Sequence, residues 1–496
     1  MLSLIVEATL LLVVLVLSAH YVRRRMKSLP PGPIGIPILG NMLDMPTHDE
    51  AQTIAGWSKK YGDMIFVTIA GTPFLYLNGA KETMDLLDKR SALYSECDMG
   101  GLVPLTGYGD RFKLERRLMN QALSARAVEK WEPLVAEETN MMLKRILDAP
   151  ERFIPHLRRM AGSLIFTSIY GYRVTSDDDP YVKAAEEFMS VSSHAILNGW
   201  LVDFLPFLRH VPGLTIHKKA AEWKIKMEEW VEKPHAMFKA TLADNPDDNS
   251  FCRTLLFPED GHPIDAETEE RIKWVATSMY GAGSDTTVAS LSQFILAMIL
   301  HPEVQKKAQN EVDAVVGRDR LPTLDDRARL PYVECVLKEC LRWGTPVPLT
   351  IPHRLSQVDE YNGHILPEGT LCVANIWAML HDERIYPEPH RFYPERYEGK
   401  MDAEQTRLLD PSTYIFGFGR RRCPGIHFAN PSVWLGMVSL LSTFTFTPSL
   451  DKKGREIIPP AKFISGTFRH PEPFKCRITP RHEGVPALIE QVQPAF

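Results

Sequence analysis

The sequence has little of what would mark a nucleic-acid-binding, disulfide-rich or disordered protein. Its 57 basic and 62 acidic residues leave a net charge of −5, so no global positive field would attract nucleic acid. Its seven cysteines are odd in number and contain no C-x-x-C pair, which excludes a disulfide framework and suits a reducing compartment. Internal repeats, low-complexity tracts and a glycine-rich dinucleotide fingerprint are also missing. A hydrophobic content of 44% excludes disorder.

The amino terminus predicts a transmembrane signal anchor over residues 1–22. Leu2 to Tyr21 is almost wholly apolar and is interrupted only by Glu7, and about twenty helical residues span a bilayer core. Three arginines and a lysine follow at 23–27, which places everything downstream in the cytoplasm by the positive-inside rule. Two alternatives are a cleaved signal peptide, which would carry basic residues before the apolar run and a small-x-small site after it, and a buried core helix.

The remaining sequence predicts a short linker followed by one large domain. Prolines crowd 29–40, and because proline fixes φ and lacks an N–H, the basic and proline-rich stretch 23–45 is a stiff extended linker that cannot be a helix. Helical periodicity dominates 82–441, so we expect one domain over 46–496 that is mainly α with a small β part. Expected helices include 131–148, 181–198, 218–243 and 303–316, and expected strands are 65–70 and 74–77, with further short strands around 351–374.

The stretch 416–425, which reads FGFGRRRCPG, is the most informative motif in the chain. Its single Cys423 cannot form a tetrahedral zinc site, which needs about four ligands, but one thiolate can be the only protein ligand of a haem iron. The glycines would let the backbone pass close beneath a porphyrin, and the arginines would offer charge to anionic propionates. The alternative is a buried, inert cysteine beside a solvated arginine cluster. The spacing F-x-x-G-x-R-x-C-x-G resembles the haem-ligand loop of the cytochrome P450 superfamily.

A second motif lies in the middle of a long helix that is expected between Pro263 and Pro302. Glycines at 281 and 283 weaken a helix, and the Thr286 hydroxyl can bond a backbone carbonyl, so we expect a local opening there. Asp285 and Thr286 resemble the acid–alcohol pair with which this superfamily delivers protons to iron-bound dioxygen. The alternative is a helix face rich in small residues that serves only for packing.

The resemblance also implies an ion network that supports the cysteine loop. Glu339 and Arg342 are three residues apart on a helix that is expected between Pro331 and Gly344, so they can share a face and pair. Arg396 would be the third partner, since 394–397 is similar to the family's P-E-R-F segment. Tyr397 replaces the usual phenylalanine of that segment.

Four further residues would contact the haem by the same resemblance. Phe112 and Arg116 fall on the family's W-x-x-x-R helix, where Phe112 replaces the tryptophan and removes one N–H donor to a propionate. Arg421 of the cysteine loop and His353 would supply further propionate contacts, the alternatives being a solvated arginine and an ordinary surface histidine. The segment 96–107 is shorter than in most relatives, either genuinely or through an imperfect gene model.

Together these features imply a membrane-anchored monooxygenase that carries haem b and inserts one oxygen atom from O2 into an apolar small molecule. Electrons would come from NADPH through a separate cytochrome P450 reductase, with cytochrome b5 as a further candidate partner. The resemblance places the chain in the endoplasmic reticulum membrane with its catalytic domain in the cytoplasm. The segment 469–474 is similar to fungal specialised-metabolism members, including O-methylsterigmatocystin-oxidoreductase-like enzymes. The alternatives are a haem-thiolate isomerase or dehydratase and a catalytically silent haem-binding protein.

Overall fold

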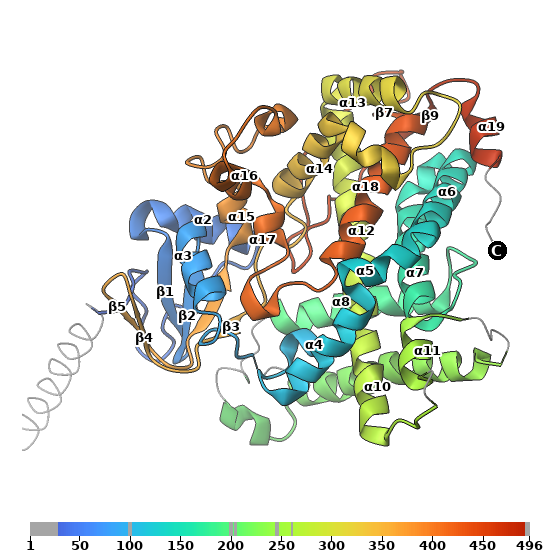
Figure 1. The fold of residues 1–496 in the computed structure, drawn as a ribbon. Helices are drawn as coiled ribbons and strands as arrows, with labels where there is room; N and C mark the ends of the chain where they lie inside the picture. The colour runs from blue at the N-terminus through green and yellow to red at the C-terminus, as the bar shows by residue number, and fades with distance from the viewer. Residues whose placement is uncertain are drawn as a thin grey trace, which may run out of the picture. The chain divides into compact units, whose positions relative to one another are not determined.

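The computed structural model describes residues 28–97, 102–197, 202, 206–243, 248–258 and 261–491, and it is mainly helical with small sheets, as expected (Figure 1). The predicted membrane anchor at 1–22 lies outside the described residues. The chain divides into two compact units. Unit 1 combines the chain up to Glu96 with Thr350–Asn375, and unit 2 comprises Cys97–Leu349 and Ile376–Phe496.

Unit 1 is built around a four-stranded sheet with the strand order β1-β2-β6-β3. β1 (Met64–Ile69) and β2 (Thr72–Leu77) form the expected antiparallel hairpin, and Ala70 and Gly71 both have positive φ, as a type I′ turn requires. β2 then pairs in parallel with β6 (Leu371–Ala374), and β3 (His353–Arg354) pairs antiparallel with β6. Figure 1 shows these blue and orange strands side by side. The other elements are α2 (Glu50–Tyr61), α3 (Ala80–Thr83), η1 (Met84–Lys89), β4 (Asp359–Tyr361) and β5 (His364–Leu366).

The proline-rich stretch is not helical, as predicted, and its described part is held against β1. The Phe66 N–H donates to the Pro31 carbonyl at 2.9 Å, and the Ala70 N–H donates to the Leu39 carbonyl at 3.0 Å. Gly40 sits at φ +60°, and a Cβ added there would meet the Thr68 carbonyl oxygen at 1.9 Å. The segment therefore covers the edge strand of the sheet, a contact that its composition did not predict.

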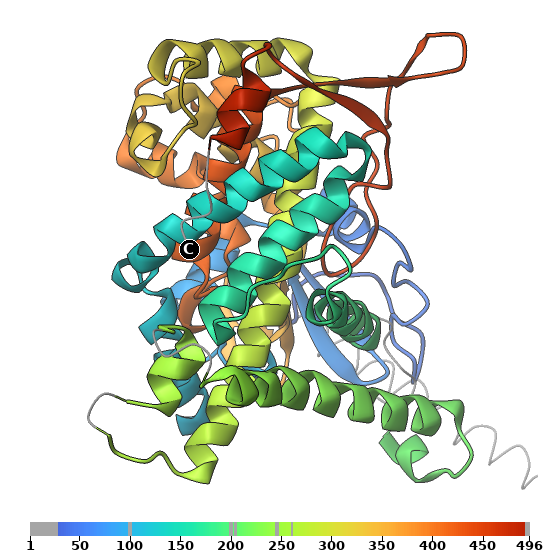
Figure 2. The ribbon, with the colours of Figure 1, turned by 90° about the vertical axis from the view of Figure 1, so that its right-hand side faces the viewer.

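Unit 2 contains most of the helices, and α12 (Ala266–Leu300) runs through its core. Asp265 caps the helix by accepting the Thr268 N–H at 2.7 Å, and Pro302 follows its end, so the bounds match the expected interval. By length and composition α12 is also apolar enough to cross a membrane, but 78% of its apolar window is buried inside the protein, as in a core helix. It packs against α7 (Phe153–Tyr170), α14 (Pro331–Gly344) and α18 (Ile426–Thr443) (Figure 2).

Four helices of unit 2 agree with the predicted ranges to within a few residues, whereas the sheet over 444–480 was not predicted. The four expected helices appear as α6 (Glu132–Asp148), α8 (Pro180–Leu197), α10 (Thr215–Thr241) and α13 (Pro302–Val315). The shorter helices are η2 (Val103–Leu105), α4 (Asp110–Leu123), α5 (Ala125–Val128), η3 (Glu129–Trp131), η4 (Pro150–Arg152), η5 (Pro206–His210), α11 (Phe251–Leu256), η6 (Leu324–Arg329), α15 (Ile376–Leu380), η7 (Pro394–Tyr397), α16 (Ala403–Leu409), α17 (Ser412–Ile415), η8 (Gly419–Arg421) and α19 (Val485–Glu490). A small sheet has the order β8-β7-β9, from β7 (Phe444–Leu450), β8 (Glu456–Ile457) and β9 (Cys476–Pro480).

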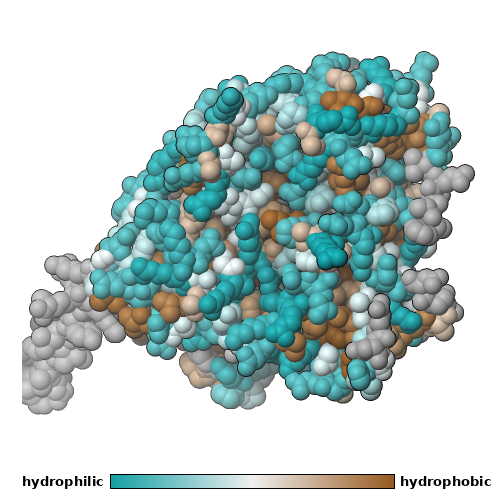
Figure 3. Space-filling view, viewed as in Figure 1, coloured by the Kyte–Doolittle hydropathy of each residue, from teal (hydrophilic) through white to brown (hydrophobic). Residues whose placement is uncertain are grey.

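The face shown in Figure 3 is mostly hydrophilic, with hydrophobic residues scattered over it. Several large apolar side chains are exposed in the proline-rich segment of unit 1, among them Ile34 at 85% and Ile38 at 86%. Isoleucines that are this exposed gain nothing from the protein's own core.

Candidate functional site

The cysteine loop connects α17 to α18 in unit 2, and two of its three glycines adopt backbone conformations that other residues avoid. Gly417 has φ +73° and Gly419 has φ +55°, both in the left-handed region. The Cys423 N–H donates to the Phe416 carbonyl at 2.7 Å, which closes the loop into a tight turn. The loop therefore presents one cysteine directly before the first turn of α18.

The Cys423 thiol is accessible to solvent although protein surrounds it on several sides. Burial raises the pKa of this thiol, whereas the Gly425 N–H and the positive charges of Arg116 and Arg422 act in the opposite direction. A Cβ added at Gly425 would lie 3.7 Å from Sγ, which is an ordinary van der Waals contact. Cys423 is thus a single accessible thiol held among donors and positive charges that favour its anion.

Of the other predicted haem-contacting residues, Arg421 belongs to this loop and two more lie against it. Arg116 on α4 donates to the Arg422 carbonyl at 2.8 Å, and burial lowers its guanidinium pKa. Phe112, one turn earlier on α4, is buried, and the Arg421 guanidinium lies 4.4 Å from its ring centroid. The structure therefore brings Phe112, Arg116, Arg421 and Cys423 together, as the sequence motifs suggested.

Arg421 has a second set of partners that the motif did not indicate. Its guanidinium donates to the Thr106 carbonyl at 2.7 Å and to the Pro104 carbonyl at 3.3 Å. These carbonyls belong to the described end of the short segment 96–107. Arg421 therefore ties this segment to the cysteine loop as well as stacking on Phe112.

Asp285 and Thr286 lie in the middle of α12, also in unit 2. Thr286 donates its hydroxyl to the Ala282 carbonyl at 3.1 Å, as predicted, and Ala282 is exposed although most of the helix is buried. The helix nevertheless runs without a break from Ala266 to Leu300, so the expected local opening does not interrupt it. The reason is that a carbonyl oxygen has two lone pairs and can accept a hydroxyl beside its helical N–H. Asp285 pairs with His470, whose Nε2 lies 3.1 Å from Oδ2.

His353 belongs to unit 1, where it lies on β3 and is buried. Its ring Nδ1 lies 2.9 Å from the Tyr94 carbonyl oxygen. It is therefore not the surface histidine of the alternative interpretation. Its contact with a propionate remains a prediction.

The expected ion network is present, and Glu339 and Arg342 at its centre are completely buried. Glu339 accepts two hydrogen bonds from Arg342 at 2.7 and 2.9 Å, and the single N–H of Arg396 Nε is shared between its two carboxylate oxygens at 3.1 and 3.2 Å. Burial alone would lower the pKa of Arg342, but the hydrogen bonds and charge of Glu339 outweigh it and the pKa is raised. Arg342 also donates to the carbonyls of Leu380, Pro389 and Arg391, so its buried N–H groups are satisfied.

Two donors to Glu339 were not expected from the sequence. Tyr397 donates its hydroxyl to Oε2 at 3.2 Å, and the Tyr393 N–H donates to Oε1 at 2.7 Å. The tyrosine that departs from the family pattern thus adds a hydrogen bond that phenylalanine could not make. Tyr397 was visible in the sequence as a departure from the family pattern. Whether its hydroxyl points toward Glu339, however, depends on packing.

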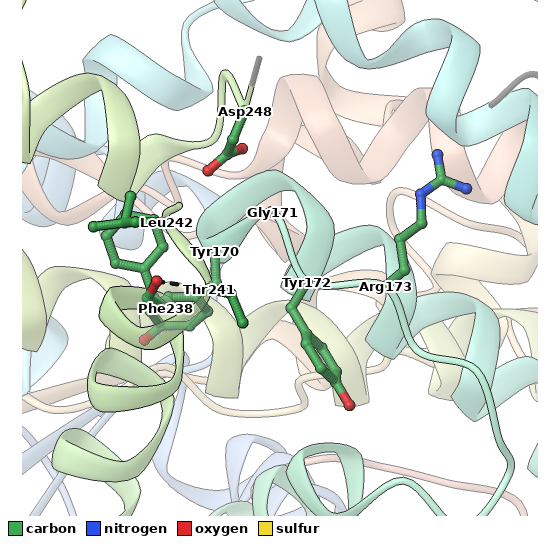
Figure 4. Close-up of a pocket in the computed structure, with 8 residues that line it drawn as sticks. All are labelled: Tyr170, Gly171, Tyr172, Arg173, Phe238, Thr241, Leu242 and Asp248. Carbon is green, nitrogen blue, oxygen red and sulfur yellow. Dashed lines mark hydrogen bonds between the residues drawn. The ribbon is translucent and has the colours of Figure 1, made fainter. Parts of the chain in front are cut away.

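A separate cavity of about 260 Å³ lies at the ends of α7 and α10 (Figure 4). Three of its polar side chains already have partners within the protein, since Arg173 pairs with Glu137, Asp248 with Ser250, and Thr241 with the carbonyl oxygen of Phe238. It shares no lining residue with the cysteine loop or with the Asp285 region, and we do not assign it a function. It is lined by Tyr170, Gly171, Tyr172, Arg173, Phe238, Thr241, Leu242 and Asp248.

Comparison with known proteins agrees with this geometry. The family model for cytochrome P450 matches residues 30–477. Cytochrome P450 monooxygenase 176 of Postia placenta is 39% identical over 494 residues, covering 96% of this chain and 95% of the relative. Cytochrome P450 monooxygenase claR of Ampulloclitocybe clavipes is 40% identical, covering 98% and 93%, and a cytochrome P450 monooxygenase of Armillaria gallica is 35% identical, covering 99% of both. The chain is therefore a member of the cytochrome P450 family and a monooxygenase.

Proposed function

We propose that this monooxygenase hydroxylates an apolar small molecule, with one oxygen atom taken from O2, in a pathway of fungal secondary metabolism. The observation that carries the proposal is the accessible Cys423 thiol with the Gly425 N–H, Arg116 and Arg422 around it. The fungal relatives, named as cytochrome P450 monooxygenases, support the reaction type. The substrate class rests on the family's preference for apolar molecules.

The residues around Cys423 fit a thiolate-ligated haem. Cys423 would hold the haem iron, because a metal ion stabilises the thiolate against the burial that otherwise favours the thiol. Arg116 and Arg421 would face the propionates, and Phe112 would pack on the porphyrin edge without donating a hydrogen bond. When bound, the haem would supply the oxygen activation, while the protein orients the substrate and tunes the iron through its ligand.

Asp285 and Thr286 would carry protons to the oxygen site from the distal side. Thr286 is half-buried and its hydroxyl can exchange its helix carbonyl for another acceptor, whereas Asp285 is 22% exposed and can reach solvent. An alcohol next to an acid in one helix is suited to passing a proton inward from water. This pair also favours an oxygenase over an isomerase, which needs no external protons or electrons.

The proposal also includes the source of the electrons and the location of the protein in the cell. Electrons would come from NADPH through a separate reductase, with cytochrome b5 as a further candidate. The predicted anchor at 1–22 would hold the chain in the endoplasmic reticulum membrane. Ile34 and Ile38, which follow the predicted anchor in the proline-rich linker, are exposed and support a position at a lipid surface.

The test is the spectrum of the full-length protein, reduced and exposed to carbon monoxide. We expect the strongly red-shifted Soret band of thiolate ligation, and Cys423→Ala should abolish it, whereas the matched control Cys476→Ala should keep it. A carbon monoxide complex without the red shift would refute thiolate ligation. NADPH oxidation with added reductase then separates the oxygenase from an isomerase or a silent haem protein, neither of which would consume NADPH.

A further inference from the structure

The only described side chain that pairs with Asp285 is His470, which comes from the C-terminal segment and lies 185 positions away in the chain. The distance between His470 Nε2 and Asp285 Oδ2 is 3.1 Å. An ionised carboxylate can only accept, so the hydrogen-bonded proton must be on Nε2. The contact therefore fixes the tautomer of the ring and occupies one of the two carboxylate oxygens.

The backbone on both sides of His470 is anchored in unit 2. The Arg469 N–H donates to the Pro346 carbonyl at 2.8 Å, and its guanidinium donates to the Gly344 carbonyl at 2.6 Å, at the end of α14. Gln293 of α12 donates to the Arg469 carbonyl, and the Ile464 N–H donates to the His470 carbonyl at 2.8 Å. The backbone that carries the imidazole is therefore held in place by hydrogen bonds, one of them from α12, the helix that contains Asp285.

This hydrogen bond contributes little to folding, because both side chains are 22% exposed and exposed ion pairs contribute at most about 1 kcal/mol. Its main effect is on the orientation of the Asp285 side chain. Without a partner, an aspartate on a helix samples several rotamers, whereas a donor on Oδ2 selects one of them. A fixed carboxylate presents Oδ1 to its surroundings in one direction.

We propose that His470 is a positioning residue for Asp285, and that the hydrogen bond from Nε2 keeps the carboxylate oriented for proton delivery. This inference rests on the proposed relay role of Asp285 and extends it to a residue outside α12. If the carboxylate were not held, proton delivery at the oxygen site would be misdirected, and O2 would take the two electrons from NADPH with two protons and leave as hydrogen peroxide (O2 + NADPH + H+ → H2O2 + NADP+). The electrons from NADPH are then released in peroxide and do not reach water or product.

The experiment measures hydrogen peroxide formed per NADPH oxidised by the full-length haem protein with added reductase. His470→Ala should raise this ratio by a factor of about 2 to 10, the range expected for losing one partly exposed hydrogen bond. His470→Gln, which keeps an N–H donor near the position of Nε2, should restore most of the wild-type ratio. His482→Ala, which removes another half-buried imidazole of the C-terminal region, should change nothing. All variants should keep the red-shifted carbon monoxide band, which shows that haem is bound.

Asp285→Asn separates the two proposals. If it leaves the peroxide ratio unchanged, the relay role of Asp285 fails. If it raises the ratio but His470→Ala does not, the relay stands and the role of His470 is overturned. In the double variant, His470→Ala should add nothing to the peroxide ratio of Asp285→Asn. Independent, additive effects would overturn the positioning role.

Discussion

Replacing Tyr397 with phenylalanine removes one hydroxyl from the buried ion network and tests how that network is stabilised. The hydroxyl donates to Glu339 Oε2 at 3.2 Å. Burial, followed by the charge of Glu339, raises the pKa of Tyr397 well above the usual value, so the hydroxyl remains a donor at all working pH values. Hydrogen bonds to charged groups contribute about 1.5–3 kcal/mol, and 3.2 Å is long for a hydroxyl donor, so we expect a loss of about 1.5 kcal/mol. Glu339 keeps its bonds from Arg342, Arg396 and the Tyr393 N–H, so no buried group is left without a partner.

Glu339→Gln sets the largest loss of stability that we expect from this network. It leaves the Arg342 guanidinium, which is fully buried, without its counter-charge, and breaking a buried pair in this way costs about 3–5 kcal/mol. With a urea m-value of about 3 kcal/mol/M, the unfolding midpoint should fall by about 0.5 M for Tyr397→Phe and by about 1 to 1.7 M for Glu339→Gln.

The matched control is Tyr393→Phe. The Tyr393 ring is exposed and only its backbone contacts Glu339, so this variant should match the wild type. The reasoning is refuted if Tyr397→Phe leaves the midpoint unchanged, or if it lowers the midpoint as much as Glu339→Gln does.

Two further predictions concern other parts of the chain. Gly40→Ala should destabilise unit 1 by about 1–3 kcal/mol or more, because φ is +60° and the new Cβ would meet the Thr68 carbonyl oxygen at 1.9 Å. Faster proteolysis within 28–96 would show this loss of stability. An unchanged digestion rate would contradict the prediction. Asp326→Asn should cost about 2 kcal/mol at neutral pH, because hydrogen bonds from Arg320 lower the pKa of Asp326 to about 2. A depressed carboxyl pKa stabilises the fold above the ordinary value near 3.8, and this contribution is lost as pH falls toward 2, so the urea midpoints of the two proteins should converge over that interval. A difference that stays constant down to pH 2 would contradict this assignment.

Local patterns predicted the helices and the ion network well, because both depend on short-range spacing. The proline-free interval before Pro302 contained α12, and the three-residue spacing of Glu339 and Arg342 placed both on one helical face. The cysteine loop was predictable for a related reason: its glycines and its single thiol are adjacent in sequence, so little depends on tertiary packing.

Contacts between distant segments could not be predicted in the same way. Nothing in the residues around His470 indicates that its ring meets Asp285, because the direction of the C-terminal segment is set by backbone hydrogen bonds to α14 and α12. The carbonyl partners of Arg421 were equally hidden, since every residue has a carbonyl and only the fold determines which one is near.

The parallel pairing of β2 with β6 has a consequence for synthesis on the ribosome. Leu77 pairs with Ala374, so the edge of β2 has no partner strand until almost three hundred further residues have been made. At roughly 5–20 residues per second, that interval is about 15–60 s. During this time the nascent hairpin presents an apolar strand with unpaired N–H and C=O groups, the kind of edge that aggregates with other chains. Production of this protein should therefore depend on chaperones that cover β2 until translation passes Asn375.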